Sequence, residues 1–131
     1  METSPRHQAR ERALSLMYEA ELKGDSPSVI LEALMVVPDP YTVALLHMVE
    51  DRGVEIDGLI DAAAIGWDLD RMAVVDRNVL RLAVAELLGS AEVPTAVILN
   101  EAVELASGYS TDDSGRFVNG VLSTLAARLR D

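Results

Sequence analysis

Residues 94–122, PTAVILNEAVELASGYSTDDSGRFVNGVL, decide the fold, because they encode two helices joined by a short polar turn. The first helix has one polar stripe at helical spacing, so the pattern predicts that the rest of its surface is buried. Pro94 suits the first turn of this helix, and Gly108 suits the left-handed residue at which many helices end. The stripe consists of Asn100, Glu101, Glu104 and Ser107.

The second helix of this stretch begins directly after the turn. Ser110, with Asp113 three residues later, resembles a capping box, and both Asp112 and Asp113 lie near the positive end of the helix dipole. Apolar residues then recur on one face over about five turns, which is typical of an amphipathic helix. That face consists of Phe117, Val118, Val121, Leu122, Leu125, Ala126 and Leu129.

The composition limits the fold class. A chain of 131 residues suits one domain, and half of its residues are apolar while only 4% are aromatic. A core with few rings favours aliphatic side chains that pack between helices. The absence of cysteine excludes disulfides, thiolate metal ligands and a cysteine nucleophile, and it fits a reducing compartment.

Similar helix signals recur in the rest of the chain. Serine followed by proline marks a helix start at Ser4 and again at Ser26, and the predicted helices span 5–24 and 27–36. A third predicted helix runs over 41–65, with a bend at Gly53.

A fourth helix, over 74–88, is apolar nearly all round, which places it in the middle of a bundle. Gly66 and Trp67 fall in a connector, so we expect one group of helices in residues 1–66 and a second in 67–131. The predicted fold class is all-α: a single domain, 1–131, forming a helical bundle of about six to seven helices in two packed groups.

The charge distribution predicts where RNA would bind. The net charge of −11 argues against general affinity for nucleic acid, but Arg6, Arg10 and Arg12 outnumber the two glutamates of the first twelve residues. Arg6, His7 and Arg10 share one flank of the first helix. That flank is either a phosphate-binding helix start or a solvated helix end.

The chain lacks signals for catalysis, for a metal site and for membrane insertion. It has no nucleophile elbow and no phosphate-binding glycine loop, and His47 lacks the second histidine of a helical zinc motif. No apolar run approaches the roughly 18 residues of a membrane span. We therefore expect a non-enzymatic cytoplasmic protein without cofactor or metal. Within the fourth helix, Arg81 and Glu86 need either internal salt bridges or a partner.

Four segments, in this order and spacing, resemble the NusB transcription antitermination factors, which are all-helical bacterial proteins. The resemblance covers nearly half of the chain, and the last two segments are the most specific. The segments are ARERALSLMYEAEL (Ala9–Leu22), DRNVLRLAVAELL (Asp76–Leu88), VPTAVILNEAVELA (Val93–Ala106) and STDDSGRFVNGVL (Ser110–Leu122).

The resemblance implies partners and site residues. It implies binding of boxA RNA together with NusE, a small-subunit ribosomal protein, and entry into the RNA polymerase elongation complex at ribosomal RNA operons. The implied RNA-binding residues are Arg6, His7, Gln8, Arg10, Arg116 and Phe117, although for Phe117 a core role is equally compatible with its apolar stripe. Tyr18 and Glu86 match positions at which family members contact the ribosomal protein.

The sequence also departs from the family pattern. His7 and Gln8 stand where the family is often basic, Ala85 replaces an aromatic residue, and Gly115 replaces a basic residue or histidine. An alternative function is therefore a divergent NusB-like interaction or homodimerisation module that has lost RNA binding. A third is the regulatory domain of an RNA cytosine methyltransferase, for whose catalytic domain this chain has no room.

Overall fold

The computed structural model describes residues 4–130, which form seven α-helices and one short 3-10 helix, with no strand in that range. The all-α prediction is confirmed. Among these residues no helix is both long and apolar enough to cross a membrane. The elements are α1 (Pro5–Lys23), α2 (Pro27–Ala33), α3 (Pro40–Asp51), α4 (Gly53–Ala63), η1 (Leu69–Arg71), α5 (Val74–Gly89), α6 (Thr95–Tyr109) and α7 (Asp112–Leu129).

Most helix starts follow the local signals in the sequence. The Ser4 hydroxyl caps α1 by accepting a hydrogen bond from the His7 backbone N–H, and Ser26 caps α2 in the same way. A proline occupies the first turn of both helices. Gly24 ends α1 with φ of 69°, a left-handed conformation that costs glycine little.

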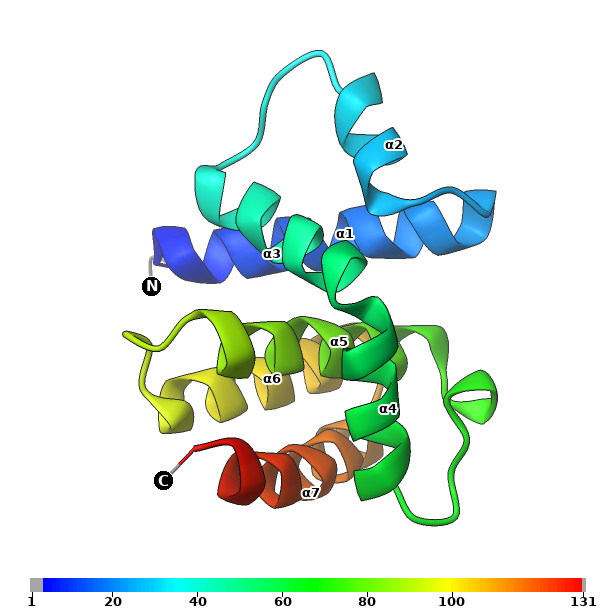
Figure 1. Ribbon diagram of the computed structural model, residues 1–131, viewed down its shortest axis with the longest axis vertical. Coiled ribbons are helices and arrows are strands. Elements are labelled where there is room, and N and C mark those ends of the chain that lie inside the picture. The colour runs from blue at the N-terminus through cyan, green and yellow to red at the C-terminus, as the bar shows by residue number, and fades with distance from the viewer. Residues whose placement is uncertain (1–3, 131) are drawn as a thin grey trace.

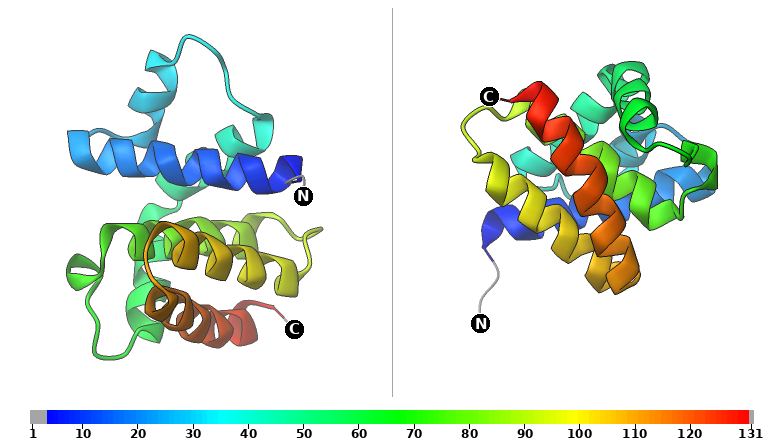
Figure 2. Two further views of the ribbon diagram at one scale, coloured as in Figure 1. Left: turned by 180° about the vertical axis from the view of Figure 1, so that it is seen from behind. Right: turned by 90° about the horizontal axis from the view of Figure 1, so that it is seen from below.

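Helix α5 is the centre of the bundle, as its apolar sequence predicts. It packs against α1 and α3 on one side and against α4, α6 and α7 on the other (Figure 1). Ten of its residues are buried, and Leu80 and Val84 are fully inaccessible to solvent. One continuous apolar core therefore connects all the helices, and α6 and α7 form an antiparallel hairpin beneath α5 (Figure 2).

The predicted helix over 41–65 is wrong, because the structure has two helices there. The chain turns at Arg52, whose φ of −112° and ψ of 24° end α3 and start α4 without a side-chain cap. Helix α4 then packs against α5 and α7 and belongs to the carboxy-terminal group in Figure 1. The sequence assigned residues 1–66 to the amino-terminal group; from these contacts we propose that α4 belongs with the second group.

Three further details of the helix ends differ from the predictions. Helix α2 ends at Ala33 instead of residue 36. Gly108 has no positive φ, and α6 continues to Tyr109. The cap of α7 is Thr111, whose hydroxyl accepts a hydrogen bond from the Ser114 backbone N–H at 3.1 Å, and not Ser110.

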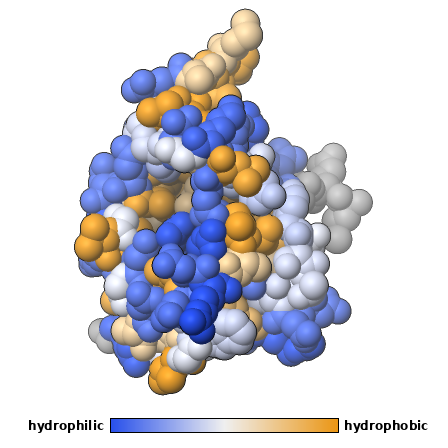
Figure 3. Space-filling view, turned by 90° about the vertical axis from the view of Figure 1, so that its right-hand side faces the viewer, coloured by the Kyte–Doolittle hydropathy of each residue, from blue (hydrophilic) through white to orange (hydrophobic). Residues whose placement is uncertain are grey.

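The segment between α2 and α3 leaves apolar side chains in solvent. Met35, Val36 and Val37 are almost fully exposed. This segment lies at the top of the molecule, where Figure 3 shows apolar residues at the surface. Two prolines follow in the sequence, so no helix covers these side chains.

Candidate nucleic-acid interface

The first turn of α1, which we call the tip, presents its polar side chains from a capped helix end. Arg6 and Gln8 are exposed and His7 is partly exposed. The Arg6 guanidinium lies 3.9 Å from the centroid of the Tyr41 ring on α3, a cation–π contact that positions the side chain and leaves its hydrogen-bond donors available. Of the predicted RNA-binding residues at this end, Arg6 is the one whose charge is directed to solvent.

Arg10 is buried, with 3% of its surface exposed. Its Nε and Nη2 donate hydrogen bonds to the two carboxylate oxygens of Glu86 at 2.7 and 2.8 Å. Burial opposes the charge of Arg10, but the hydrogen bonds and charge of Glu86 outweigh it, so the pKa of Arg10 is raised. The sequence predicted an RNA contact here; in the structure the guanidinium is instead committed to an internal partner.

Glu86 is equally enclosed, with 2% of its surface exposed. It also accepts a hydrogen bond from the Tyr41 hydroxyl at 2.6 Å, and that hydroxyl lies 3.0 Å from Ser90 Oγ. Burial and the hydrogen bond to Glu86 raise the pKa of Tyr41. The sequence left two explanations for Glu86 open, an internal salt bridge or contact with a partner. In the structure Glu86 forms an internal salt bridge with Arg10. We call these two residues the buried pair.

His7 meets carboxylates of α6 across the surface of the bundle. Its Nδ1 lies 2.5 Å from Glu101 Oε2, and its Nε2 lies 3.7 Å from Glu11 Oε1. The hydrogen bond to Glu101 raises the pKa of His7 against the opposing effect of burial. Glu101 Oε1 lies 3.6 Å from Arg10 Nη1, so carboxylates offset most of the positive charge at the tip.

Arg116 is exposed on the first turns of α7 and forms an ion pair with Asp113. It lines an open hollow of ≈ 580 Å³ between α6 and α7, together with Glu104 and Asn100. Gly115 is buried beneath this surface, and a Cβ there would lie 2.2 Å from Ser107 Oγ. A side chain at position 115 would therefore require the Ser107 hydroxyl on α6 to move.

Phe117 packs partly into the core, and its ring makes an edge-to-face contact with Trp67, with centroids 5.8 Å apart. Both rings line a hollow of ≈ 310 Å³ that also contains Asp76, whose Oδ1 is buried without a hydrogen-bond partner. The structure therefore does not place Phe117 beside the tip residues. Trp67 lies in the connector before η1, and about half of its surface is exposed.

Tyr18, the other predicted partner-binding residue, is 43% exposed. It lines a mainly apolar hollow of ≈ 320 Å³ with Leu14, Val75 and Tyr109. The Tyr109 hydroxyl donates a hydrogen bond to Glu11 at 2.9 Å, so this hollow joins α1, α5 and α6. The sequence did not identify Tyr41 and Tyr109 as site residues. Their hydroxyls donate hydrogen bonds to residues 45 and 98 positions away, so no local pattern marks them.

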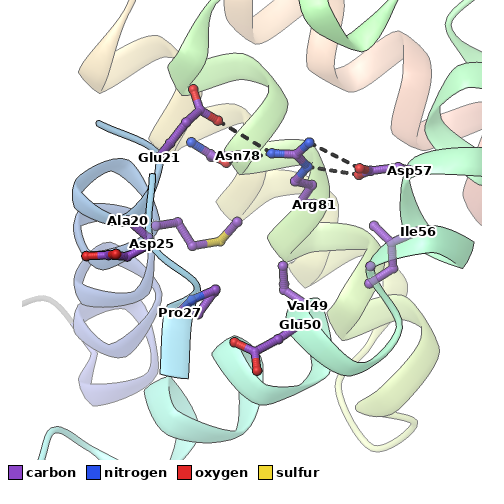
Figure 4. A pocket seen from close by; sticks show the side chains of 12 residues that line it. Ala20, Glu21, Asp25, Pro27, Val49, Glu50, Ile56, Asp57, Asn78 and Arg81 are labelled. Atoms are coloured by element: carbon purple, nitrogen blue, oxygen red, sulfur yellow. Dashed lines mark hydrogen bonds and ion pairs between the residues drawn. The ribbon is translucent and has the colours of Figure 1, made fainter. Parts of the chain in front are cut away.

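A second group of charges joins α1 to α5 near the other end of α1. Arg81 donates to Asp57 at 2.9 and 3.1 Å and lies 3.5 Å from Glu21 (Figure 4). Glu21 also pairs with Arg77. We call Glu21, Asp57, Arg77 and Arg81 the seam cluster. Asn78 lies beside it, and its Nδ2 is buried without a hydrogen-bond partner.

Gly120 lies inside α7, where a glycine is less favourable than alanine. It is exposed. Among the described residues, no atom apart from its chain neighbours and the nearby backbone of α7 comes within 4 Å of the position that a Cβ would take. Packing within the chain therefore does not account for glycine at this position.

Comparisons with known proteins agree on one family. The NusB family model matches residues 7–127. The transcription antitermination protein NusB of Thermobifida fusca is 45% identical over 124 residues, which cover 92% of this chain and 87% of that protein.

Solved structures agree with this match. T. maritima NusB superposes with a TM-score of 0.85 at 33% identity, over 97% of this chain and 93% of that one. A crystal structure of the antitermination factors NusB and NusE in complex with double-stranded RNA gives 0.80 at 28% identity, over 95% of this chain and 97% of that one. The chain belongs to the NusB family.

Proposed function

We propose that this protein is a non-enzymatic, cytoplasmic transcription antitermination factor. It binds boxA RNA together with the ribosomal protein NusE and joins the RNA polymerase elongation complex at ribosomal RNA operons. The observation that carries this proposal is the family match over residues 7–127, since relatives named antitermination proteins share nearly the whole chain. One structural relative is a NusB that binds NusE and double-stranded RNA.

The RNA-binding surface in this proposal is the tip with the adjoining face of α6 and α7. The start of a helix offers backbone N–H groups and a positive dipole to phosphate oxygens, and Arg6, His7 and Gln8 surround it. Arg116 adds a cation on α7, and Phe117 offers a ring edge for a base on the other side of the hairpin.

In this proposal Arg10 does not contact RNA itself but holds α1 in position. Its side chain has almost no exposed surface with which to hold a phosphate, but its two hydrogen bonds to Glu86 fix the position and rotation of the tip on α5. Substitution of Arg10 therefore displaces Arg6 and His7 as well. Glu86 supports the partner surface in the same indirect way, while Tyr18 contacts the ribosomal protein from its exposed hollow.

The test is a fluorescence-anisotropy titration of boxA RNA and of a scrambled RNA, with and without NusE, at two salt concentrations. We expect a preference for boxA that NusE strengthens and that weakens with salt, because phosphate contacts release counterions. Arg6→Ala and Arg116→Ala should each weaken binding and flatten the salt slope. Lys23→Ala is the matched control, since it removes one exposed charge at the far end of α1.

The alternative function, an interaction or homodimerisation module without RNA binding, has its own support. Carboxylates stand beside His7 and Arg10, and the chain carries a net charge of −11. No preference for boxA in either condition of the titration would favour this alternative. Light scattering over a range of protein concentrations would then show whether the partner is a second copy of the chain.

A further inference from the structure

His7, Glu101 and Glu104 bring three potential metal ligands together from two helices. One ligand atom of each residue can be chosen so that all three lie within 4.8 Å of one another. Glu101 and Glu104 are three residues apart, so they share one face of α6, while the imidazole comes from the first turn of α1. Only the tertiary structure joins these groups, because 94 residues separate His7 from Glu101.

The geometry points to a site for a divalent transition-metal ion, with Zn²⁺ as the best match, held by His7, Glu101 and Glu104. This departs from the sequence analysis, which expected no metal. Ligand atoms about 2.1 Å from a tetrahedral ion lie about 3.4 Å from one another, so shifts of about 1 Å or less convert the cluster into a coordination shell.

The donor set selects the kind of ion. An imidazole nitrogen with two carboxylate oxygens suits Zn²⁺ and its neighbours in the first transition row, whereas Mg²⁺ and Ca²⁺ prefer oxygen alone. His7 is well placed to act as a ligand, since its side chain is 14% exposed and its Nδ1 already lies 2.5 Å from Glu101 Oε2. A metal ion would displace the proton that these two atoms share and release it to solvent.

The local charge also favours a cation. Glu11, Glu101 and Glu104 surround His7, while the nearest arginine, Arg10, donates two hydrogen bonds to Glu86 and lies 3.6 Å from Glu101. The negative charge of the carboxylates around His7 therefore exceeds the positive charge of the groups beside them. A divalent ion would neutralise this excess at the place where the proposed function needs positive charge.

If the proposed function holds, the metal ion has a role in RNA binding. Glu104 is exposed and lines the hollow that contains Arg116, so an ion on Glu104 would face the same surface as that arginine. Three protein ligands leave a fourth position free for water or a phosphate oxygen. The ion would bring two positive charges and release one proton, so the net charge between the tip and α7 would rise by one.

The direct test is isothermal titration calorimetry of the chelator-treated full chain with Zn²⁺, with Co²⁺ absorption as a second readout. We expect one ion per chain, and at least a tenfold loss of affinity in His7→Ala and in Glu104→Gln. His47→Ala is the matched control, because it removes the other histidine, an exposed one on α3, and it should bind Zn²⁺ as the parent does. Circular dichroism verifies that each variant is folded.

Two results would overturn the metal site: no binding by the parent protein at millimolar Zn²⁺, or equal affinity in the parent, His7→Ala and Glu104→Gln. Glu104 makes no side-chain hydrogen bond among the described residues, so Glu104→Gln tests the site without disturbing the α1–α6 contact.

The link to RNA is measured separately. boxA anisotropy with Zn²⁺ and with chelator should differ by about tenfold in the parent, and this ratio should fall to one in Glu104→Gln. A metal ion that binds without changing the ratio would confirm the site and overturn its role in RNA binding. No boxA binding in any condition would contradict the proposed function, while the calorimetry would still decide the metal site.

Discussion

Helix α1 is joined to α5 by arginine–carboxylate pairs at two places, and the two places differ in their access to water. Near the start of α1, the side chains of Arg10 and Glu86 are 4% and 3% exposed. Near its end, the side chains of Glu21, Arg77 and Arg81 are 18–25% exposed. The same chemistry thus holds one helix in a dry and in a wet environment.

The difference shows what each group contributes. Water reaches the partly buried seam cluster more than it reaches the buried pair, so each pair in the cluster should add less to stability. The buried pair pays a desolvation cost that only complete hydrogen bonding offsets, and it has two bonds between its members with a third from Tyr41. The buried pair should therefore define the position of the tip, while the seam cluster tolerates change.

The largest expected effect is that of Glu86→Ala, which removes both hydrogen bonds from the buried Arg10 guanidinium and leaves only Glu101, at 3.6 Å, beside it. We expect the free energy of unfolding to fall by about 3–5 kcal/mol, measured by urea denaturation. The double substitution Arg10→Met/Glu86→Leu should recover most of this loss, because it removes both charges. If Glu86→Ala lowers the free energy of unfolding by less than about 1 kcal/mol, water reaches the Arg10 guanidinium. The buried pair and the seam cluster would then not differ in their environment.

A smaller effect is expected for Tyr41→Phe, which removes one hydroxyl from the buried pair. The hydrogen bond to the Glu86 carboxylate is lost, and Ser90 loses a neighbour, so stability should fall by about 1–2 kcal/mol. The ring remains beneath Arg6, which separates the hydroxyl from the cation–π contact. Unchanged stability would mean that the carboxylate needs only Arg10.

The seam cluster should respond less. Glu21→Gln removes the carboxylate that Arg77 and Arg81 share, and the loss should be at most about 1 kcal/mol. The difference from the parent should shrink further in 0.5 M salt, because salt screens exposed charges. A loss equal to that of Glu86→Ala, or one independent of salt, would contradict the assignment of this cluster to a wet environment.

The smallest effect on stability is expected for Arg6→Ala. It removes a single cation–π contact at an exposed position, which is worth about 0.5–1 kcal/mol. The same substitution should nevertheless weaken boxA binding more than Glu21→Gln does. Thermal denaturation and anisotropy on the same samples would distinguish the two effects, and equal RNA affinity in both variants would contradict the role of the tip.

The sequence predicted the helices well wherever a local signal marks them. Ser4, Ser26 and Gly24 mark helix ends because caps and left-handed glycines act within a few residues. The break at Arg52 has no capping side chain, and its one local signal, Gly53, predicted only a bend. A continuous apolar pattern on both sides of Arg52 therefore predicted one helix where the structure has two.

By itself, the sequence determined that this chain folds as a bundle of helices, that its fourth apolar segment lies in the centre, and that arginines gather near its amino-terminal end. These properties depend on periodicity and on charges that are close in the sequence. Only the tertiary structure decided that Arg10 faces Glu86 and that His7 faces Glu101, because partners 76 and 94 residues apart meet only after the helices pack. Burial changes a charged residue from a surface ligand to an internal support, and burial is a property of the whole fold.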